Sequence, residues 1–216
     1  MDTVRISQLL APFLAAPLAE DQLVRISTYI DILLRWNRKL NLTAVRETEQ
    51  IVPRHFGESI FAAQKLFAAT DPACAMRLVD VGSGAGFPGI PIKLCFPELH
   101  VTLIESNNKK ATFLREVVRA IALTNTDVFI GRAEDFPPRS TDVVTLRAVE
   151  RFEHAVAVAA AIVRPRARLA LLVGAAQVSR ALALVPQFRW NEPLPIPQSS
   201  SRVLLIGTSG AEEPSE

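Results

Sequence analysis

The sequence has little cysteine, no long apolar run and almost no net charge. Only two of its 216 residues are cysteines, and Cys74 and Cys95 are too far apart for a metal-binding pair. A reducing cytosol would keep both thiols free, so we expect Cys95 to be a small apolar helix residue and Cys74 a loop residue. The cysteine content therefore argues against a disulfide scaffold and predicts no metal site.

The apolar runs are too short for a membrane protein. A membrane helix needs about 18 uninterrupted apolar residues, and the longest candidates, residues 155–163 and 169–173, fall well below that length. The N-terminus reads MDTVRISQLL, which lacks the basic and apolar regions of a secretory signal. We expect a cytoplasmic protein with no membrane partner.

The net charge of +2 does not by itself indicate a nucleic-acid binder. The basic residues are nevertheless clustered, and such patches steer polyanions as well as forming ordinary solvated faces. The clusters are Arg35, Arg38 and Lys39, then Lys109 and Lys110, then Arg164, Arg166 and Arg168.

Hydrophobic residues are plentiful, at 49% of the chain, which suits one medium-sized domain with a small appendage. Residues 1–72 are predicted to form a helical N-terminal extension. Leu23, Ile26, Ile30 and Leu33 recur at helical spacing, and shorter helices are expected at about 6–14 and 58–68.

From Arg77 short β-rich runs alternate with helical segments, which predicts a parallel sheet covered on both faces. The final two runs have only a Pro- and Ser-rich loop, residues 191–201, between them and should pair antiparallel. The fold class is therefore α/β, a doubly wound, seven-stranded, mostly parallel sheet over residues 73–208, with 209–216 expected as a disordered tail. The predicted strands are 78–81, 101–105, 128–130, 143–146, 169–173, 188–190 and 203–206, and the helices between them are 90–96, 109–121 and 150–163.

A glycine-rich segment follows the first predicted strand. It runs from Asp80 through Gly82, Gly84 and Gly86 to Gly89, at a strand-to-helix junction where ligands bind in such sheets. A dinucleotide-binding loop would have its third glycine at position 87, which is Phe87. The spacing therefore favours S-adenosylmethionine over NAD, with Asp80 facing the cationic amino-acid end of the cofactor.

Two further strand ends carry acids in register with this loop. Glu105 ends the second predicted strand and can accept hydrogen bonds from both ribose hydroxyls, or cap the next helix. Ala133 and Glu134 follow the third strand and can meet the adenine edge, although Glu134 or Asp135 could equally cap a helix. Arg147 ends the fourth strand, facing cofactor and substrate or forming a structural ion pair.

Several segments, in the same order along the chain, resemble one family. They are residues 36–43 (Trp-Asn-Arg-Lys-Leu-Asn-Leu-Thr), Arg54-His55-Phe56, residues 79–91 with Gly-Phe-Pro-Gly-Ile-Pro, Lys109-Lys110 with Phe113-Leu114-Arg115, residues 131–136 and Arg147-Ala148. These segments resemble the bacterial small-subunit ribosomal RNA guanine-N7 methyltransferases, also called glucose-inhibited division protein B (RsmG/GidB). The resemblance implies a class I, Rossmann-like methyltransferase fold after a helical extension.

The resemblance also implies the chemistry. It implies cofactor contacts from Gly82, Phe87, Ala133, Glu134 and Arg147, and a guanine of the ribosomal decoding region as substrate. The expected partner is small-subunit ribosomal RNA or an immature subunit, and we expect a monomer. Guanine N7 is a nucleophile without deprotonation, so alignment and electrostatics suffice, and the sequence has neither an Asn-Pro-Pro-Tyr-like motif nor a Pro-Cys nucleophile.

Departures from the family pattern keep other hypotheses open. Gly57-Glu58 stands where the family has a hydrophobic residue and Asp, Val173 replaces a common lysine, and the last strand ends at Gly207 instead of a basic residue. These departures motivate a diverged methyltransferase for another RNA or small molecule. A non-catalytic RNA-binding assembly protein is a third hypothesis, and His55 could contact RNA or pack between the two parts.

Overall fold

The computed structural model describes residues 1–67, 75–149 and 151–211. The N-terminal part is helical, as predicted, and includes a six-residue π-helix directly before α4. The elements are α1 (Thr3–Leu10), η1 (Ala11–Phe13), α2 (Glu20–Leu40), α3 (Thr48–Ile51), the π-helix η2 (Val52–Gly57) and α4 (Glu58–Phe67).

The longest helix, α2, has favourable charges at both ends. Glu20 and Asp21 lie in its first turn and Arg38 and Lys39 in its last, each opposite in sign to the helix dipole there. Asn41 ends the helix in the left-handed region, with φ of 46°. This turn directs the following residues toward the edge of the sheet.

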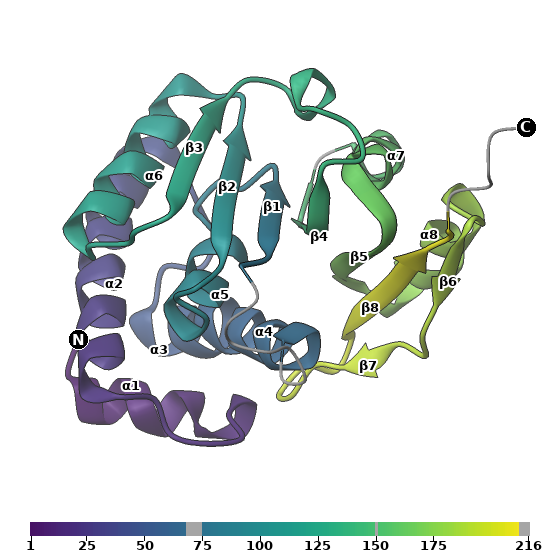
Figure 1. The fold of residues 1–216 in the computed structure, drawn as a ribbon. Helices are drawn as coiled ribbons and strands as arrows, with labels where there is room; N and C mark the ends of the chain where they lie inside the picture. Colours follow the sequence, from purple (N-terminus) through teal and green to yellow (C-terminus); the bar gives the residue numbers. More distant parts are fainter. Residues whose placement is uncertain (68–74, 150, 212–216) are drawn as a thin grey trace, which may run out of the picture.

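The second part is a doubly wound sheet with the order β3-β2-β1-β4-β5-β8-β6. Strands β1 to β5 pair in parallel, and β8 pairs antiparallel with β5 and β6 (Figure 1). The elements are β1 (Arg77–Val81), α5 (Gly89–Cys95), β2 (His100–Glu105), α6 (Asn108–Ala120), β3 (Thr126–Ile130), η3 (Ala133–Asp135), β4 (Thr141–Arg147), α7 (Phe152–Ile162), β5 (Val163–Gly174), η4 (Ala175–Gln177), α8 (Val178–Leu184), β6 (Phe188–Trp190), β7 (Leu194–Pro195) and β8 (Arg202–Ser209).

The predicted mostly parallel sheet is confirmed, with three local differences. The two-residue strand β7 lies within the predicted loop and pairs with β8. Helix α8 was not predicted, and β8 continues to Ser209, the first residue of the predicted tail. The domain boundary at 72, Cys74, Glu150 at the start of a predicted helix, and residues 212–216 lie outside the described residues.

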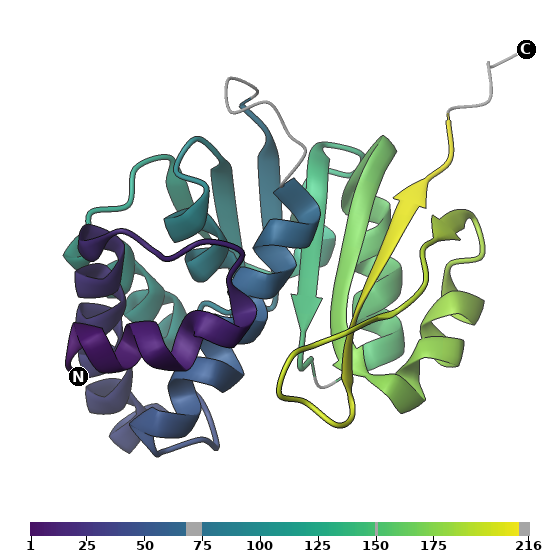
Figure 2. The same ribbon diagram turned by 90° about the horizontal axis from the view of Figure 1, so that it is seen from below.

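Alternation along the strands divides the interior into two cores. Leu78 and Ala170 face the N-terminal helices with α4, α5 and α6, whereas their neighbours Val79 and Leu169 face α7 and α8. Figure 2 shows the purple-to-blue N-terminal helices on one side of the sheet and the green helices α7 and α8 on the other. The molecule is thus a three-layer α/β/α arrangement.

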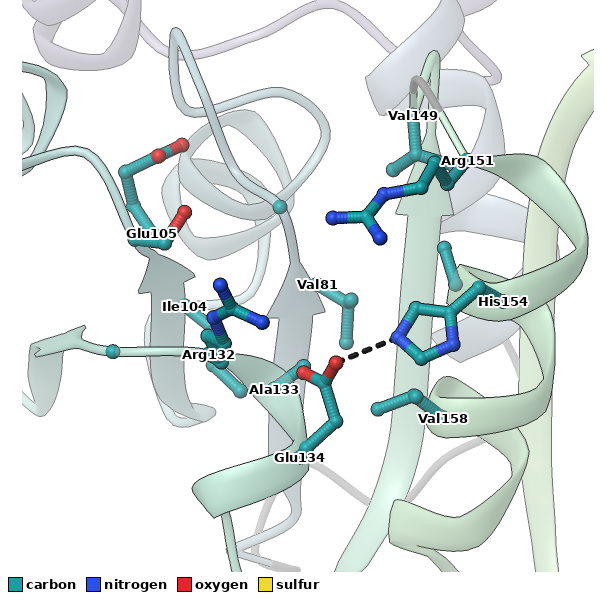
Figure 3. A pocket seen from close by; sticks show the side chains of 14 residues that line it. Val81, Ile104, Glu105, Arg132, Ala133, Glu134, Val149, Arg151, His154 and Val158 are labelled. Carbon is teal, nitrogen blue, oxygen red and sulfur yellow. Dashed lines mark hydrogen bonds and ion pairs between the residues drawn. The ribbon is translucent and has the colours of Figure 1, made fainter.

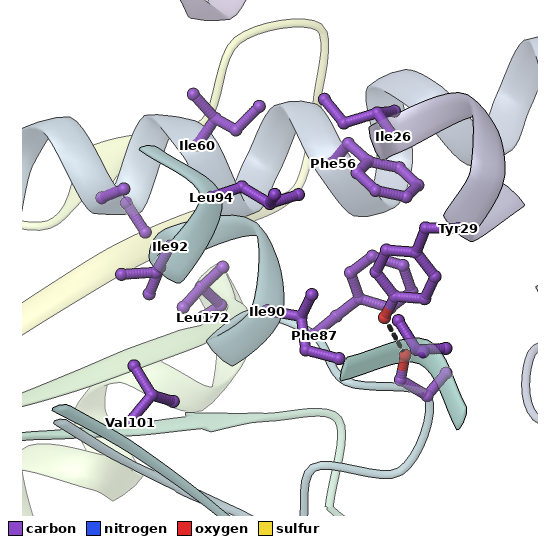
Figure 4. Packing of buried hydrophobic residues seen from close by; sticks show 14 of the residues in the cluster. Ile26, Tyr29, Phe56, Ile60, Phe87, Ile90, Ile92, Leu94, Val101 and Leu172 are labelled. Atoms are coloured by element: carbon purple, nitrogen blue, oxygen red, sulfur yellow. Dashed lines mark hydrogen bonds between the residues drawn. The ribbon is translucent and has the colours of Figure 1, made fainter. Parts of the chain in front are cut away.

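The N-terminal helices and the sheet share one of these cores. Tyr29 of α2 stacks on Phe87 with ring centroids 5.3 Å apart, and Phe56 of η2 meets both rings edge-on at 5.1 Å (Figure 4). The Tyr29 hydroxyl donates to the carbonyl of Ala85 in the glycine loop. The helical extension therefore holds the glycine loop from behind. Within the described ranges, no helix combines the length and apolar character needed to cross a membrane.

Candidate active site

Two adjoining cavities lie at the carboxyl ends of the parallel strands. The first, of about 230 Å³, lies between the ends of β1 and β2, η3 and α7 (Figure 3). The second, of about 670 Å³, lies between the glycine loop, the loop after α2 and the end of β4. The residues that line both are Gly82, Glu105, Ser106 and Val149. The two cavities therefore meet at the ends of β1, β2 and β4.

The glycine loop needs glycine for two different reasons. Gly84 and Gly86 have φ of 54° and 86°, in the left-handed region. A Cβ on Gly84 would have only the Gly82 carbonyl within 4 Å, at 3.8 Å, so this position faces open space. A Cβ on Gly86 would lie 2.5 Å from the Tyr29 hydroxyl and 2.6 Å from Ile90. Gly84 thus faces the second cavity and Gly86 faces the core.

Asp80 lies beneath this loop. It is fully buried, accepts hydrogen bonds from Thr145 Oγ1 at 2.8 Å and the Gly89 amide at 3.3 Å, and lines neither cavity. Burial raises the pKa of its carboxyl to about 6, against the opposing effect of these hydrogen bonds. The structure thus places Asp80 where it holds the loop, instead of facing the amino-acid end of a ligand as expected.

Glu105 lies where the two cavities meet. Its carboxylate is 7% exposed and accepts hydrogen bonds from the amides of Asn107 at 2.8 Å and Gly84 at 2.9 Å. The helix cap of α6 is supplied by Asn107, whose side chain accepts from Lys109 and Lys110. Because a carboxylate has about four acceptor positions, Glu105 retains acceptor capacity toward the cavities.

Ala133 and Glu134 line the first cavity from η3. The Glu134 carboxylate contacts His154 Nε2 of α7 at 2.6 Å, and this hydrogen bond lowers the pKa of Glu134 (Figure 3). Arg132 and Arg151 extend toward the cavity from opposite sides in the same view. The arginines and His154 were not predicted as site residues, because α7 meets η3 only through the tertiary fold.

Phe87, for which the resemblance implies a cofactor contact, lies mostly among protein side chains. It is 7% exposed and lies between two protein rings, Tyr29 at 5.3 Å and His55 at 4.8 Å, both nearly parallel to it. Its edge reaches the second cavity. Phe87 therefore joins the glycine loop to the N-terminal helices, and only a small part of the ring is available to a ligand.

Arg147 is held at the end of β4 by groups from the N-terminal part. Its side chain is 7% exposed, and Nη2 donates to the Arg54 carbonyl at 2.8 Å and to His55 Nδ1 at 3.0 Å. Nη2 also lies 3.4 Å from a carboxylate oxygen of Glu58. Among the described residues, its Nη1 is a buried polar atom without a hydrogen-bond partner. The ion pair that the sequence left open as the structural alternative thus exists, and the side chain of Arg147 also lines the second cavity.

His55 acts as a neutral acceptor for Arg147. Since Nδ1 accepts from Arg147, the proton lies on Nε2, which donates to Thr43 Oγ1 at 2.8 Å. Burial, with the charges of Arg147 and Arg54, lowers the His55 pKa to about 3. With both nitrogens engaged, His55 packs between the two parts of the protein.

The His55 pKa predicts a pH-dependent stability. Below its ordinary pKa of 6.5 the His55 side chain takes up a proton in the unfolded chain but not in the folded protein, so the contribution of His55 to the free energy of unfolding falls as pH drops toward 3. Between pH 7.5 and pH 5 this loss amounts to about 2 kcal/mol. In urea denaturation, the change in the free energy of unfolding from pH 7.5 to pH 5 should be more destabilising by about this amount in the wild type than in His55→Gln, because the opposing effect of the raised Asp80 pKa is common to both proteins. Equal pH dependence in the two proteins would contradict this protonation state.

Comparison with known proteins identifies the family. Residues 22–189 match the family model described as rRNA small subunit methyltransferase G, or GidB. The chain belongs to this family. A protein of the same name from Streptococcus pyogenes serotype M5 (strain Manfredo) is 34% identical over 211 residues, covering 92% of this chain and 88% of that protein. The family predicted from the sequence segments is therefore confirmed.

Several methyltransferase G proteins match this chain over little more than half of their own length. The Bacillus subtilis (strain 168) protein is 44% identical over 140 residues, which is 62% of this chain and 56% of that protein. Among solved structures, a SAM-dependent methyltransferase from Aquifex aeolicus aligns with a TM-score of 0.59 at 14% identity, over 78% of this chain and 96% of that one. This structural likeness shows the fold.

The match to the methyltransferase G family includes every residue that lines the two cavities, since these lie between Leu42 and Val158. It ends at residue 189 and so does not include β8. Among the described residues there is no group of three or more His, Cys, Asp or Glu side chains suited to a metal ion.

Proposed function

We propose that this protein transfers a methyl group from S-adenosylmethionine to N7 of a guanine in small-subunit (16S) ribosomal RNA. The observation that carries the proposal is the pair of adjoining cavities, with a buried arginine at their edge that keeps one nitrogen unpartnered. The names of the relatives, ribosomal RNA small subunit methyltransferase G, support the substrate class.

The residues around the cavities fit S-adenosylmethionine. Ala133 and Glu134 would meet the adenine, and Glu105 would accept from the ribose hydroxyls with its remaining lone pairs. The open side of Gly84 leaves room for the amino-acid end of S-adenosylmethionine. Arg147 Nη1, which has no other partner among the described residues, can donate a hydrogen bond to this end of the cofactor and to the substrate. S-adenosylmethionine supplies an electrophilic methyl group on a positively charged sulfur. The ring of Phe87 would complete the wall behind the loop.

The second cavity suits a reaction at guanine N7. The N7 lone pair attacks without losing a proton, so the site must hold the base in line and supply charge complementarity. His55 lines this cavity, but it has no free nitrogen and a pKa of about 3. The fixed guanidinium of Arg147 offers a donor at the same place. These features suit an enzyme that positions the guanine base for attack, and they do not suit one that removes a proton from its substrate.

Three of the four departures from the family pattern have a packing explanation, which favours this function over a diverged one, whereas the fourth, Glu58, pairs with Arg54 and Arg147 beside the second cavity. A Cβ on Gly57 would lie 2.6 Å from the ring of Phe13, and one on Gly207 would lie 2.7 Å from the ring of Trp190. The aromatic rings thus fill the space of larger residues. Val173 is a buried strand residue in the core beneath α7 and α8. None of the three lines either cavity.

Calorimetry with S-adenosylmethionine tests the cofactor site. Glu105→Gln should weaken binding about 10- to 100-fold, because it removes charge-assisted hydrogen bonds worth roughly 1.5–3 kcal/mol. The matched control is Glu153→Gln, which changes an exposed carboxylate of α7 that pairs with Arg180. Equal affinity in both variants would remove Glu105 from the site. A wild-type protein that binds no S-adenosylmethionine would favour the non-catalytic assembly protein.

A further inference from the structure

The buried carboxylate of Glu58 forms ion pairs with three arginines beside the second cavity. The side chain of Glu58 is 2% exposed. One of its oxygens lies 2.7 Å from Arg54 Nη1 and 2.5 Å from Arg202 Nη2 and accepts a hydrogen bond from Arg202 Nε at 2.7 Å, while the other lies 3.4 Å from Arg147 Nη2. Three cations on one anion leave a net charge of about +2, which exceeds what an internal ion pair requires.

The excess positive charge of this cluster lies on the two arginines that are partly exposed to solvent. Arg54 and Arg202 have side chains that are 34% and 29% exposed, whereas Glu58 and Arg147 are nearly covered. A guanidinium has five N–H donors in a fixed fork. Glu58 accepts hydrogen bonds from one nitrogen of Arg202 and one of Arg54, and Arg202 Nη2 lies within ion-pair distance of it. Each arginine therefore keeps donors for an external anion while Glu58 fixes its orientation.

The position of Arg202 extends the edge that carries the cavities. Arg147 is opposite Leu172 in the β4–β5 register, and Arg202 is opposite Gly174 in the β5–β8 register. Arg202 therefore lies at the same carboxyl edge, two strands from Arg147 and away from the cavity at β2 and η3. Arg54 lines the second cavity, and Glu58 contacts both Arg54 and Arg202, so the carboxylate connects the cavity wall with the end of β8.

We propose that Arg54 and Arg202, oriented by Glu58, form a clamp for a backbone phosphate of the RNA next to the target guanine. The proposal rests on the proposed function. An RNA strand whose base enters the second cavity continues across the edge at β5 and β8, where the clamp offers two guanidinium forks. Arginine binds phosphate through paired hydrogen bonds of this kind. Arg202 lies beyond the residues that match the family model.

The test is the salt dependence of RNA binding. Fluorescence anisotropy with labelled small subunits that lack 7-methylguanosine would be recorded between about 50 and 200 mM KCl at constant Mg²⁺. Arg202→Gln should weaken binding about 5- to 20-fold at low salt and reduce the slope of log K against log[salt] by about one. Arg202→Lys should keep the wild-type slope, because it retains the charge. The affinity for S-adenosylmethionine should be unchanged in both.

Two controls separate a phosphate contact from a structural role. Arg180→Gln, at an exposed arginine of α8 that pairs with Glu153, should leave affinity and slope unchanged. Arg54→Gln should reproduce the lower slope and provides the measurement if Arg202→Gln does not fold. A wild-type slope in both Arg202→Gln and Arg54→Gln, whether or not affinity falls, would overturn the clamp. A wild-type protein that does not bind the particles would instead overturn the proposed function.

Discussion

Arg147→Ala is expected to lower methyl transfer at least a hundredfold while the protein stays folded. The loss follows from removal of a preorganised charged donor in the site, where single donors contribute about 10²- to 10³-fold to turnover. The fold should survive because Glu58 keeps Arg54 and Arg202 as partners, so no buried charge is left unpaired. Single-turnover rates with saturating S-adenosylmethionine, with thermal melting alongside, provide the measurement.

Arg147→Lys distinguishes a fixed fork from simple charge. A lysine ammonium keeps the charge but cannot reproduce the planar donor pattern that His55 Nδ1, the Arg54 carbonyl and the ligand require. We therefore expect at least a tenfold lower rate in this variant as well. Wild-type rates in Arg147→Ala, with normal folding, would leave Arg147 with a structural ion pair alone.

The second large effect concerns two glycines of one loop. Gly84→Val should weaken S-adenosylmethionine binding at least a hundredfold, because its side chain enters the space where the ligand approaches the loop. A left-handed valine costs about 1–3 kcal/mol of stability. Gly86→Val has the same backbone cost and also collides with Tyr29 and Ile90, adding about 1–3 kcal/mol or more.

Calorimetry and urea denaturation together test this difference. Gly84→Val should remain folded without binding the cofactor, whereas Gly86→Val should lose several kcal/mol of the 5–15 kcal/mol typical of a domain. If Gly84→Val binds S-adenosylmethionine normally, the ligand does not lie over this loop. If Gly86→Val is as stable as Gly84→Val, the loop is not packed against α2 as described.

The sequence predicted those parts of the molecule that depend on local patterns. Short β-rich runs alternating with amphipathic helices identified five parallel strands, and the glycines after β1 identified the edge of the sheet that carries the cavities. Helix α8 was missed, as was the two-residue β7, which forms only because β8 lies alongside it. The six-residue π-helix was also missed, although Arg54 and His55 within it were recognised as a family segment.

The side-chain network could not be predicted, because it joins distant parts of the chain. Glu58, Arg147 and Arg202 come from α4, β4 and β8, and no local pattern indicates that they meet. Asp80 shows the same difficulty in another form. An acidic residue at the end of a strand can face the ligand or the interior. Here the Asp80 carboxylate faces the interior, where it accepts hydrogen bonds from Thr145 and Gly89.

Methyl transfer to guanine N7 of small-subunit RNA can be measured directly. The direct measurement incubates the protein with methyl-labelled S-adenosylmethionine and small subunits from cells that lack 7-methylguanosine in that RNA, and identifies the labelled nucleoside by mass spectrometry. We expect labelled 7-methylguanosine with the wild-type protein and at least a hundredfold less with Arg147→Ala. Absence of labelled 7-methylguanosine from a wild-type protein that binds S-adenosylmethionine by calorimetry would contradict the claim.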